Sequence, residues 1–334
     1  MTDGLTYSDV PDRIGELRAR QPAKLEAAKA RLASMPSLQH PKPNRDGDTE
    51  TVGDVTVTHR FVEAPGDSEM VRWHLVECGP RDDDSPTIVF LHGLPDSWWE
   101  WNHALAHFGR SRHCIAVDLK GYGQSEKGTG DYRQVGVAHQ LRELLNVLGI
   151  GRISLVAHDR GAVIADYLMA EEPYRAARYV RGQQHLWHLH PDLYPQEARF
   201  LATSAPETFS RAQEFVTATY GMISDREVSD DDLMRTCAEW SHEGVSGSVP
   251  RYFHSSSFRQ EWVDRRRRLI SAWKCPVLLV QGRHDAAQPY EYYTDAAVLE
   301  RLPRGSGVRL LDAGHFWPLE VPDEANAVMA PFLE

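Results

Sequence analysis

The sequence has no long apolar run and no recognisable export signal. A transmembrane helix needs about 20 predominantly apolar residues in succession, and no stretch of the 334 residues provides them. The first residues, MTDGLTYSDVPDR, lack the charged start and apolar stretch of a signal peptide. We therefore expect no membrane partner and a cytoplasmic location.

Cysteine is scarce, and its four positions are widely scattered: Cys78, Cys114, Cys237 and Cys275. They form no CxxC pair and no zinc-ligand spacing, so reduced thiols are the simplest interpretation. His185, His188 and His190 have no ordered carboxylate or cysteine partner nearby that would complete a metal site. The sequence therefore predicts neither a metal nor another cofactor.

Positive charge is outweighed, because 37 Lys and Arg stand against 48 Asp and Glu, which gives a net charge of −11. Nucleic-acid binding needs clustered positive charge against the phosphates, so this balance argues against a nucleic-acid partner. The hydrophobic content of 41% allows a large core. The chain length suits one large α/β domain with an inserted subdomain.

Short apolar segments alternate with helical segments along most of the chain. The strand-like segments include TIVFL, HCIAVDL, ISLVAHD, AARYVRG, PVLLVQG and GVRLLDAG. Helical segments such as VAHQLRELLNVLG and GAVIADYLMAEEP lie between them. This alternation predicts an α/β fold with a mostly parallel central sheet and helices on both faces.

Two segments break this alternation. Residues 1–50 contain one or two charged helices and a polar, proline-containing linker, so we expect an N-terminal helical leader that is also a candidate for a homodimer contact. Residues 183–270 have helical windows and many aromatic residues, so we expect a helical cap. The α/β core would then comprise residues 51–182 and 271–334.

The segment Ala157-His158-Asp159-Arg160-Gly161 follows an apolar strand and opens a helix. Small residues on both sides of a central residue at such a turn are typical of a nucleophile elbow, which exposes the central side chain above the sheet. Here that side chain is Asp159. A carboxylate is ionised at neutral pH and displaces leaving groups from saturated carbon, as found in epoxides and alkyl halides. The alternative is that Asp159 only caps the helix.

Three further segments fit the same site, each at the end of an expected strand. Leu94 follows the His-Gly pair 92–93, where a backbone N–H points into an oxyanion hole, and the Arg160 N–H would be the second donor. His315 is placed as a general base, and Asp285 would orient its ring. The order Asp159, Asp285, His315 is the chain order of triads in this fold. Each residue taken alone could be an ordinary turn residue.

These motifs resemble the α/β-hydrolase-fold epoxide hydrolase family, to which haloalkane and fluoroacetate dehalogenases are related. HGLPDSWWEW (92–101) is similar to the family's HGxPxSWxxW segment, DLKGYGQSEK (118–127) to the loop after the next strand, and VAHDRGA (156–162) to the elbow. The resemblance covers residues 51–334. It implies hydrolysis of an epoxide to a vicinal diol through an ester on Asp159, which a water activated by His315 resolves.

The resemblance also implies further site residues. The family protonates the ring oxygen with cap tyrosines, and Tyr252 resembles the later of these by position. The residues that would contact a bulky or aromatic epoxide are Trp187, His188, Tyr194 and Trp98. For any one of the cap aromatics, packing within the cap is the competing interpretation.

Arg160 departs from the family, since epoxide hydrolases usually carry Trp there. An Arg at this position resembles the fluoroacetate dehalogenases. Those enzymes have a second Arg three residues on, where this chain has Val163, and an acid after the sixth strand, where residues 181–184 read RGQQ. Three alternatives stay open: a haloacid or haloalkane dehalogenase that uses Asp159, an esterase-like or carbon–carbon hydrolase in which Asp159 serves differently, and a non-catalytic relative that binds a small molecule.

Overall fold

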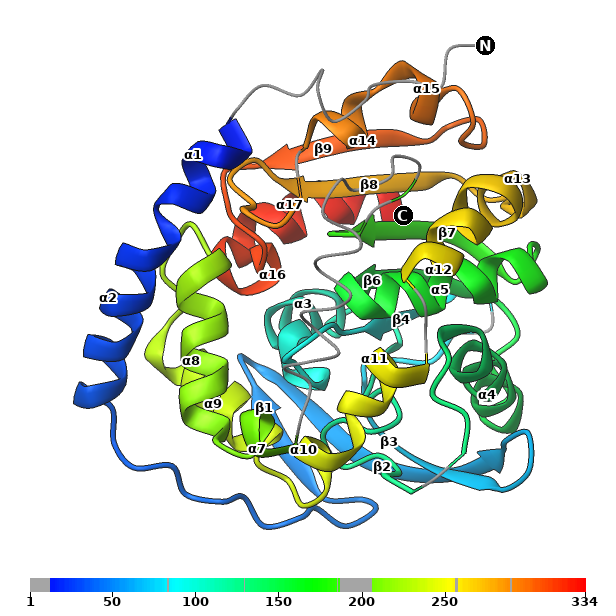
Figure 1. Cartoon of the computed structure of the whole chain (residues 1–334). Helices are drawn as coiled ribbons and strands as arrows, with labels where there is room; N and C mark the ends of the chain where they lie inside the picture. The colour runs from blue at the N-terminus through cyan, green and yellow to red at the C-terminus, as the bar shows by residue number, and fades with distance from the viewer. Residues whose placement is uncertain are drawn as a thin grey trace.

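The computed structural model describes residues 13–82, 84–128, 130–184, 186, 206–255, 258–288 and 290–334. These residues form a nine-stranded sheet with the order β1-β2-β3-β5-β4-β6-β7-β8-β9 (Figure 1). The strands are β1 (Thr49–Val52), β2 (Val55–Pro65), β3 (Met70–Cys78), β4 (Thr87–Leu91), β5 (Cys114–Val117), β6 (Ile153–His158), β7 (Ala176–Gly182), β8 (Val277–Gly282) and β9 (Gly307–Leu311).

The sheet has an antiparallel and a parallel part. β1, β2, β3 and β5 pair antiparallel in that order, whereas every pair from β5 through β4, β6, β7 and β8 to β9 is parallel. The prediction of an α/β fold with a mostly parallel central sheet is confirmed. Because the parallel strands run in one direction, the loops at their carboxyl ends gather along one edge of the sheet.

Helices cover both faces of the sheet (Figure 1). Before β7 they are α1 (Arg13–Ala19), α2 (Gln21–Ser34), the 3₁₀-helix η2 (Trp98–Trp101), α3 (Asn102–Phe108), α4 (Gln134–Val147) and α5 (Asp159–Glu171). Between β7 and β8 they are α7 (Pro206–Phe209), α8 (Ala212–Ile223), α9 (Asp230–Trp240), α10 (Val245–Ser248), α11 (Pro250–Ser255), α12 (Phe258–Asp264), the π-helical turn η3 (Arg265–Leu269) and α13 (Ile270–Ala272). After β8 they are α14 (Glu291–Thr294), α15 (Ala296–Leu299), α16 (Trp317–Glu320) and α17 (Pro322–Leu333).

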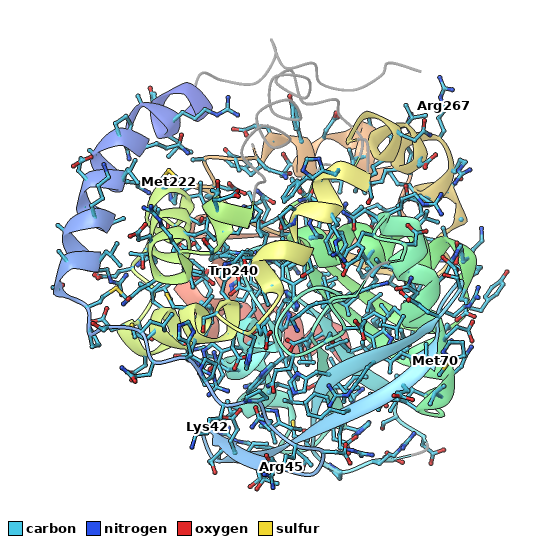
Figure 2. The ribbon with its side chains drawn as sticks, turned by 60° about the horizontal axis from the view of Figure 1, so that its bottom comes forward. Lys42, Arg45, Met70, Met222, Trp240 and Arg267 are labelled. Atoms are coloured by element: carbon cyan, nitrogen blue, oxygen red, sulfur yellow. The ribbon has the colours of Figure 1, made fainter. Side chains whose placement is uncertain are left out.

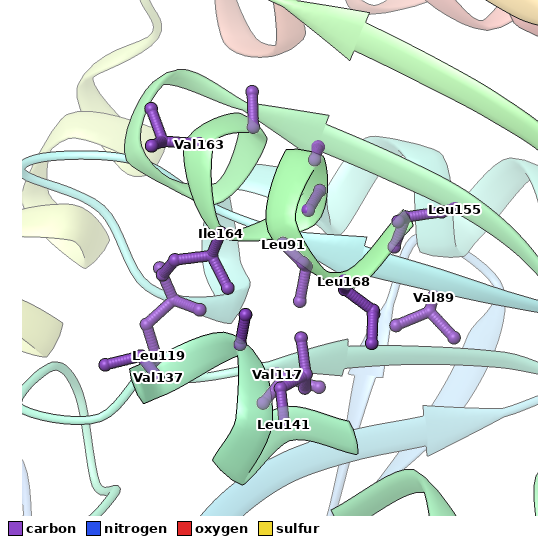
Figure 3. Packing of buried hydrophobic residues seen from close by; sticks show 14 of the residues in the cluster. Val89, Leu91, Val117, Leu119, Val137, Leu141, Leu155, Val163, Ile164 and Leu168 are labelled. Carbon is purple, nitrogen blue, oxygen red and sulfur yellow. The ribbon is translucent and has the colours of Figure 1, made fainter. Parts of the chain in front are cut away.

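Two apolar clusters lie on the two faces of the sheet. All five residues of β4 are buried, and alternate side chains point to opposite faces. Val89 and Leu91 pack with residues of α4 and α5, including Leu141 and Leu168 (Figure 3). Ile88 and Phe90 instead join the cluster built from α3, α16 and α17. Burial on both faces explains why this strand reads as a continuous apolar run.

The leader helices pack against α8. A Cβ atom at Gly221 of α8 would lie 2.4 Å from the Cβ of Ala28 in α2, so the two helices are in close contact. The Lys24 ammonium donates to the Ser224 carbonyl just after α8. The sheet itself begins with β1 at Thr49, slightly inside the segment expected to be leader and linker. The domain boundaries at 50, 182 and 270 stay a prediction.

The side chains differ sharply in exposure across the molecule. Trp240 of α9 lies in the interior, whereas Met70 at the start of β3 is 53% exposed (Figure 2). All four cysteines are buried and unpaired by disulfides. Across the described ranges, no helix combines the length and the apolar character needed to cross a membrane.

Candidate active site

Asp159 occupies a sharp turn between β6 and α5. It is the first residue of α5, and its φ of 44° lies in the left-handed region that L-residues rarely adopt. Such a conformation costs on the order of 1–3 kcal/mol and is common at functional sites. A Cβ at Gly161 would lie 2.5 Å from the Leu91 carbonyl oxygen, so only glycine fits there. The turn therefore has the steric requirements predicted for the elbow.

The two oxygens of the Asp159 carboxylate have different partners. The Leu94 N–H donates to Oδ2 at 3.1 Å, which is the contact expected of an oxyanion-hole donor. The other oxygen, Oδ1, accepts from the side-chain amide of Gln184 and lies 3.8 Å from His315 Nε2. The second expected donor, the Arg160 N–H, follows Asp159 directly, and its role stays a prediction.

His315 and Asp285 meet as the sequence predicted. His315 Nδ1 lies 3.0 Å from Asp285 Oδ2, and the second oxygen of Asp285 accepts from the N–H groups of Ala287 and Gln288. Asp285 is completely buried. With Nδ1 held by the carboxylate, the imidazole directs Nε2 toward Asp159.

The loop that carries His315 is tied down by Glu320 of α16. This buried carboxylate accepts 2.8 Å hydrogen bonds from the N–H groups of Gly314 and Phe316, on either side of His315. The His315 N–H itself donates to the carbonyl of Ile223, at the end of α8. The position of the ring is thus set by both α16 and α8.

The electrostatics of the site favour an ionised carboxylate beside a protonated ring. Burial alone would raise the pKa of Asp159. The charges of His315, His158 and Arg160 outweigh burial and hold that pKa below its usual range. Burial likewise opposes a charge on His315, but Asp285, Asp159 and Glu100 outweigh it and raise the pKa of the ring to about 9.

The remaining predicted residues are placed less favourably. The Tyr252 hydroxyl donates to the Lys120 carbonyl at 2.7 Å, so in this structure it is not directed at Asp159. Trp98 packs edge-on against His59 and Trp99 in the interior, contacts that give no support to a role in substrate binding. The other three candidates, Trp187, His188 and Tyr194, lie outside the described residues, as do His185 and His190.

Two adjacent glutamines at the carboxyl end of β7 belong to the site and were not predicted. Gln183 Nε2 donates to Asp285 Oδ2 at 2.6 Å, and Gln184 Nε2 donates to Asp159 Oδ1. Gln183 is fully buried and has a φ of 52°. The available signal was position, since residues that follow a parallel strand face the ligand-binding edge of the sheet.

Tyr122 is a second residue that the sequence did not single out. It is completely buried, and within the described residues its hydroxyl has no hydrogen-bond partner. Its ring contacts those of His92 and Tyr252 at centroid distances of 5.0 and 5.7 Å. The Arg160 guanidinium lies 5.1 Å from the Tyr252 ring centre and 4.6 Å from that of Phe253. Tyr122 and Arg160 therefore flank the same aromatic ring.

Comparison with known proteins decides the family. The profile of the alpha/beta hydrolase fold family matches residues 86–322. The chain belongs to this family. This α/β hydrolase is 35% identical to epoxide hydrolase B of Mycobacterium tuberculosis, an alignment that covers 82% of this chain and 98% of that one. The resemblance to the epoxide hydrolase family is thereby confirmed.

Two further comparisons are narrower. Epoxide hydrolase 2 of Caenorhabditis elegans is 34% identical over 108 residues, which is 32% of this α/β hydrolase and 29% of the length of that relative. The crystal structure of an epoxide hydrolase from Vigna radiata superposes with a TM-score of 0.67 over 83% of this chain and 97% of that one, at 21% identity. At that identity the superposition confirms the predicted α/β-hydrolase fold alone.

A search for metal ligands adds nothing to this site. Within the ranges that the structure describes, no group of three or more His, Cys, Asp and Glu side chains is arranged to hold a metal ion. The side chains around Asp159 are instead suited to covalent and acid–base chemistry.

Proposed function

We propose that this α/β hydrolase opens an epoxide to a vicinal diol through an alkyl ester on Asp159. The observation that carries the proposal is the asymmetry of the Asp159 carboxylate. Leu94 N–H holds Oδ2, whereas Oδ1 faces the base His315 at 3.8 Å. Oδ1 also accepts from the Gln184 amide. Once that amide releases it, Oδ1 can attack a ring carbon while Leu94 holds Oδ2.

The first half-reaction forms the ester. Asp159 Oδ1 bonds to a ring carbon, the carbon–oxygen bond of the ring breaks, and the ring oxygen takes a proton from an acid. The predicted acid, Tyr252, would first have to release the Lys120 carbonyl. Tyr122 packs against the Tyr252 ring, and its hydroxyl has no hydrogen-bond partner within the described residues. Burial raises the pKa of Tyr122 while the Arg160 charge opposes that rise, so the hydroxyl holds its proton until an alkoxide develops. We therefore favour Tyr122 as the donor.

The second half-reaction hydrolyses the ester. His315 takes a proton from water, the water oxygen attacks Asp159 Cγ, and Leu94 N–H and Arg160 N–H stabilise the oxyanion. The bond from Cγ to the alkyl oxygen then breaks, and the diol oxygen takes the proton from His315. The proton left on the regenerated Asp159 carboxyl passes to the tyrosinate, which restores the ionised nucleophile and the neutral donor. Because ester formation removes the charge of Asp159, one of the causes that raise the pKa of His315 disappears. The ring thus becomes a better base once the ester has formed.

The test is to trap the ester. In a His315→Gln variant the first half-reaction proceeds and the second stops, so incubation with an aryl epoxide should add the whole epoxide mass to the protein. The double variant Asp159→Ala/His315→Gln is the matched control and should gain nothing. Peptide mapping should place the added mass on Asp159. An adduct on another residue, or one that persists in the double variant, contradicts the proposal.

Arg160 favours a second candidate, dehalogenation of a haloacid by the same nucleophile. Its guanidinium is buried next to Asp159, and its Nε has no partner among the described residues. A cation in that position suits a substrate carboxylate. The same trapping experiment with a haloacetate separates the two, because dehalogenation adds the substrate minus hydrogen halide.

The predictions about the substrate class, the cap, the oligomeric state and the cellular location are part of this proposal. The rings of Tyr122, Tyr252 and Phe253 around Arg160 support a bulky or aromatic epoxide. A helical cap, a homodimer through the leader and a cytoplasmic location remain predictions from the sequence. Substrate contacts with Trp187, His188 and Tyr194 remain part of the proposal.

A further inference from the structure

Glu100 and His158 form a buried pair that the reaction outlined above does not use. Glu100 belongs to η2, and His158 is the last residue of β6, directly before Asp159. The two side chains are 1% and 0% exposed, and Glu100 Oε1 lies 2.5 Å from His158 Nδ1. A carboxylate buried to this extent needs a polar partner, and the His158 ring lies directly against it.

The second nitrogen of His158 contacts the loop that carries the general base His315. Nε2 lies 3.0 Å from the carbonyl oxygen of His315, and the two rings meet edge-on at a centroid distance of 5.2 Å. A carbonyl only accepts hydrogen bonds, and so does a carboxylate. Nε2 therefore donates to the His315 carbonyl, while Nδ1 keeps its close contact with the Glu100 carboxylate.

The second oxygen of Glu100 reaches the loop of the oxyanion donor. Glu100 Oε2 accepts from the Gly93 N–H at 3.0 Å, and His92 Nδ1 lies 2.8 Å from the Gly93 carbonyl. Both peptide groups of Gly93 are thereby fixed. The Gly93 carbonyl and the Leu94 N–H belong to one planar trans peptide group, so they point in opposite directions. With the carbonyl held by His92, the N–H points toward Asp159 Oδ2.

We propose that Glu100 and His158 are positioning residues for the hydrolysis of the ester on Asp159. The inference rests on the proposed function and adds to it. Through one carboxylate and one ring, the pair links the oxyanion loop at Gly93, the elbow at Asp159 and the base loop at His315.

The two half-reactions depend on this pair to different degrees. Ester formation needs Asp159 Oδ1 and an acid, neither of which the pair contacts. Ester hydrolysis needs the Leu94 N–H at the oxyanion and His315 within reach of a water, and the pair holds both loops. Small displacements of such groups reduce rates strongly because the reaction needs a defined geometry. Removal of the pair should therefore slow hydrolysis more than alkylation.

A purely structural ion pair would behave differently. Its loss would lower the free energy of unfolding and the fraction of active enzyme, and both half-reactions would fall together. The ratio of the two rates in folded enzyme therefore separates positioning from stability.

The experiment compares Glu100→Leu, Glu100→Gln and wild type in single-turnover reactions with an aryl epoxide, followed by rapid quench and intact mass. For Glu100→Leu we expect ester hydrolysis to slow by about tenfold, the lower range for lost supporting contacts, with a much smaller change in alkylation, so that ester accumulates. Glu100→Gln keeps an acceptor for Gly93 and a donor for His158, and should lie between. Glu239→Gln removes another buried carboxylate, paired with Arg235, and should leave the ratio unchanged.

Equal slowing of both steps, or an unchanged ratio in both Glu100 variants, would overturn the inference. Glu100→Gln carries the test alone should Glu100→Leu not fold. A second measurement needs no turnover: the ¹⁵N shifts of the His158 ring should differ between wild type and Glu100→Gln, because the two rings face different groups. Identical shifts refute the contact even where no ester forms, whereas a missing ester in His315→Gln refutes only the proposed reaction.

Discussion

Asp285 and Asp118 each follow a strand of the parallel part of the sheet and each hold a histidine ring, but only one of these two rings faces the elbow. Asp285 follows β8 and holds His315 Nδ1 at 3.0 Å. Asp118 follows β5 and holds His74 Nδ1 at 2.7 Å. All four side chains are buried. Residue types, distances and burial therefore do not distinguish the two pairs.

The difference lies in the second nitrogen of each ring. His315 Nε2 faces Asp159 at 3.8 Å, and among the described residues it has no hydrogen-bond partner of normal length. His74 Nε2 instead meets His59 Nδ1 at 2.9 Å, and His59 continues to Glu50 at 3.0 Å. Glu50 in turn binds both terminal nitrogens of Arg235 in α9. One ring is left available for proton transfer, and the other is a link in a chain that fastens α9 to the sheet.

The largest expected effect comes from Asp285→Asn. The substitution keeps the size of the side chain but turns an amide toward the donors of Gln183, Ala287 and Gln288. It also removes the charge that stabilises protonated His315. We expect the hydrolytic half-reaction to fall by roughly 10³–10⁴-fold, as when a triad acid is neutralised. Rapid-quench mass spectrometry should show the ester accumulating, and unaltered turnover would contradict the assignment.

The matched change in the other pair is His74→Gln. It breaks the buried contact with Asp118 and the link to His59. Loss of one partner from a buried pair destabilises by about 3–5 kcal/mol, so urea unfolding should show a drop of that order. The ratio of alkylation to hydrolysis in the folded fraction should stay at the wild-type value. A selective loss of hydrolysis would show that this pair also serves the reaction.

The smallest effect is the dependence of stability on pH. The pKa of His315 is about 9 in the folded protein and about 6.5 in an unfolded chain. The folded state thus binds this proton more tightly, and the resulting stabilisation is complete below pH 6.5 and declines as the pH rises to 9. Unfolding of wild type and His315→Gln should show a difference that shrinks over this window. A difference that grows would mean that Asp285, Asp159 and Glu100 do not raise the pKa of His315 as described.

The sequence predicted the parts of the site that local patterns determine. Asp159, Asp285 and His315 each follow an apolar run that could only be a buried strand, and their order restricted the fold. The strand at 176–182 and the two leader helices were also predicted. The sequence could not predict that the Tyr252 hydroxyl donates a hydrogen bond within the protein, because its acceptor is the carbonyl of Lys120, 132 positions away in sequence.

The same holds for the pair behind the elbow. Glu100 looked like one residue of an aromatic segment, and His158 like a spacer before the nucleophile. Their contact depends on how the loop after β4 lies against β6, which is a property of the assembled sheet. Gln183 was predictable in part. Its position after β7 placed it near the ligand-binding edge of the sheet, but its hydrogen bond to Asp285 depended on the loop after β8.

The close contact between Gly221 and Ala28 has an evolutionary consequence. Any side chain at position 221 would collide with α2, so the leader and α8 cannot change independently. Relatives without a leader are free of this restriction. Among homologues, a residue larger than glycine at this position should occur only where the leader is missing. The residue at this one position should therefore indicate whether a homologue carries the leader helices.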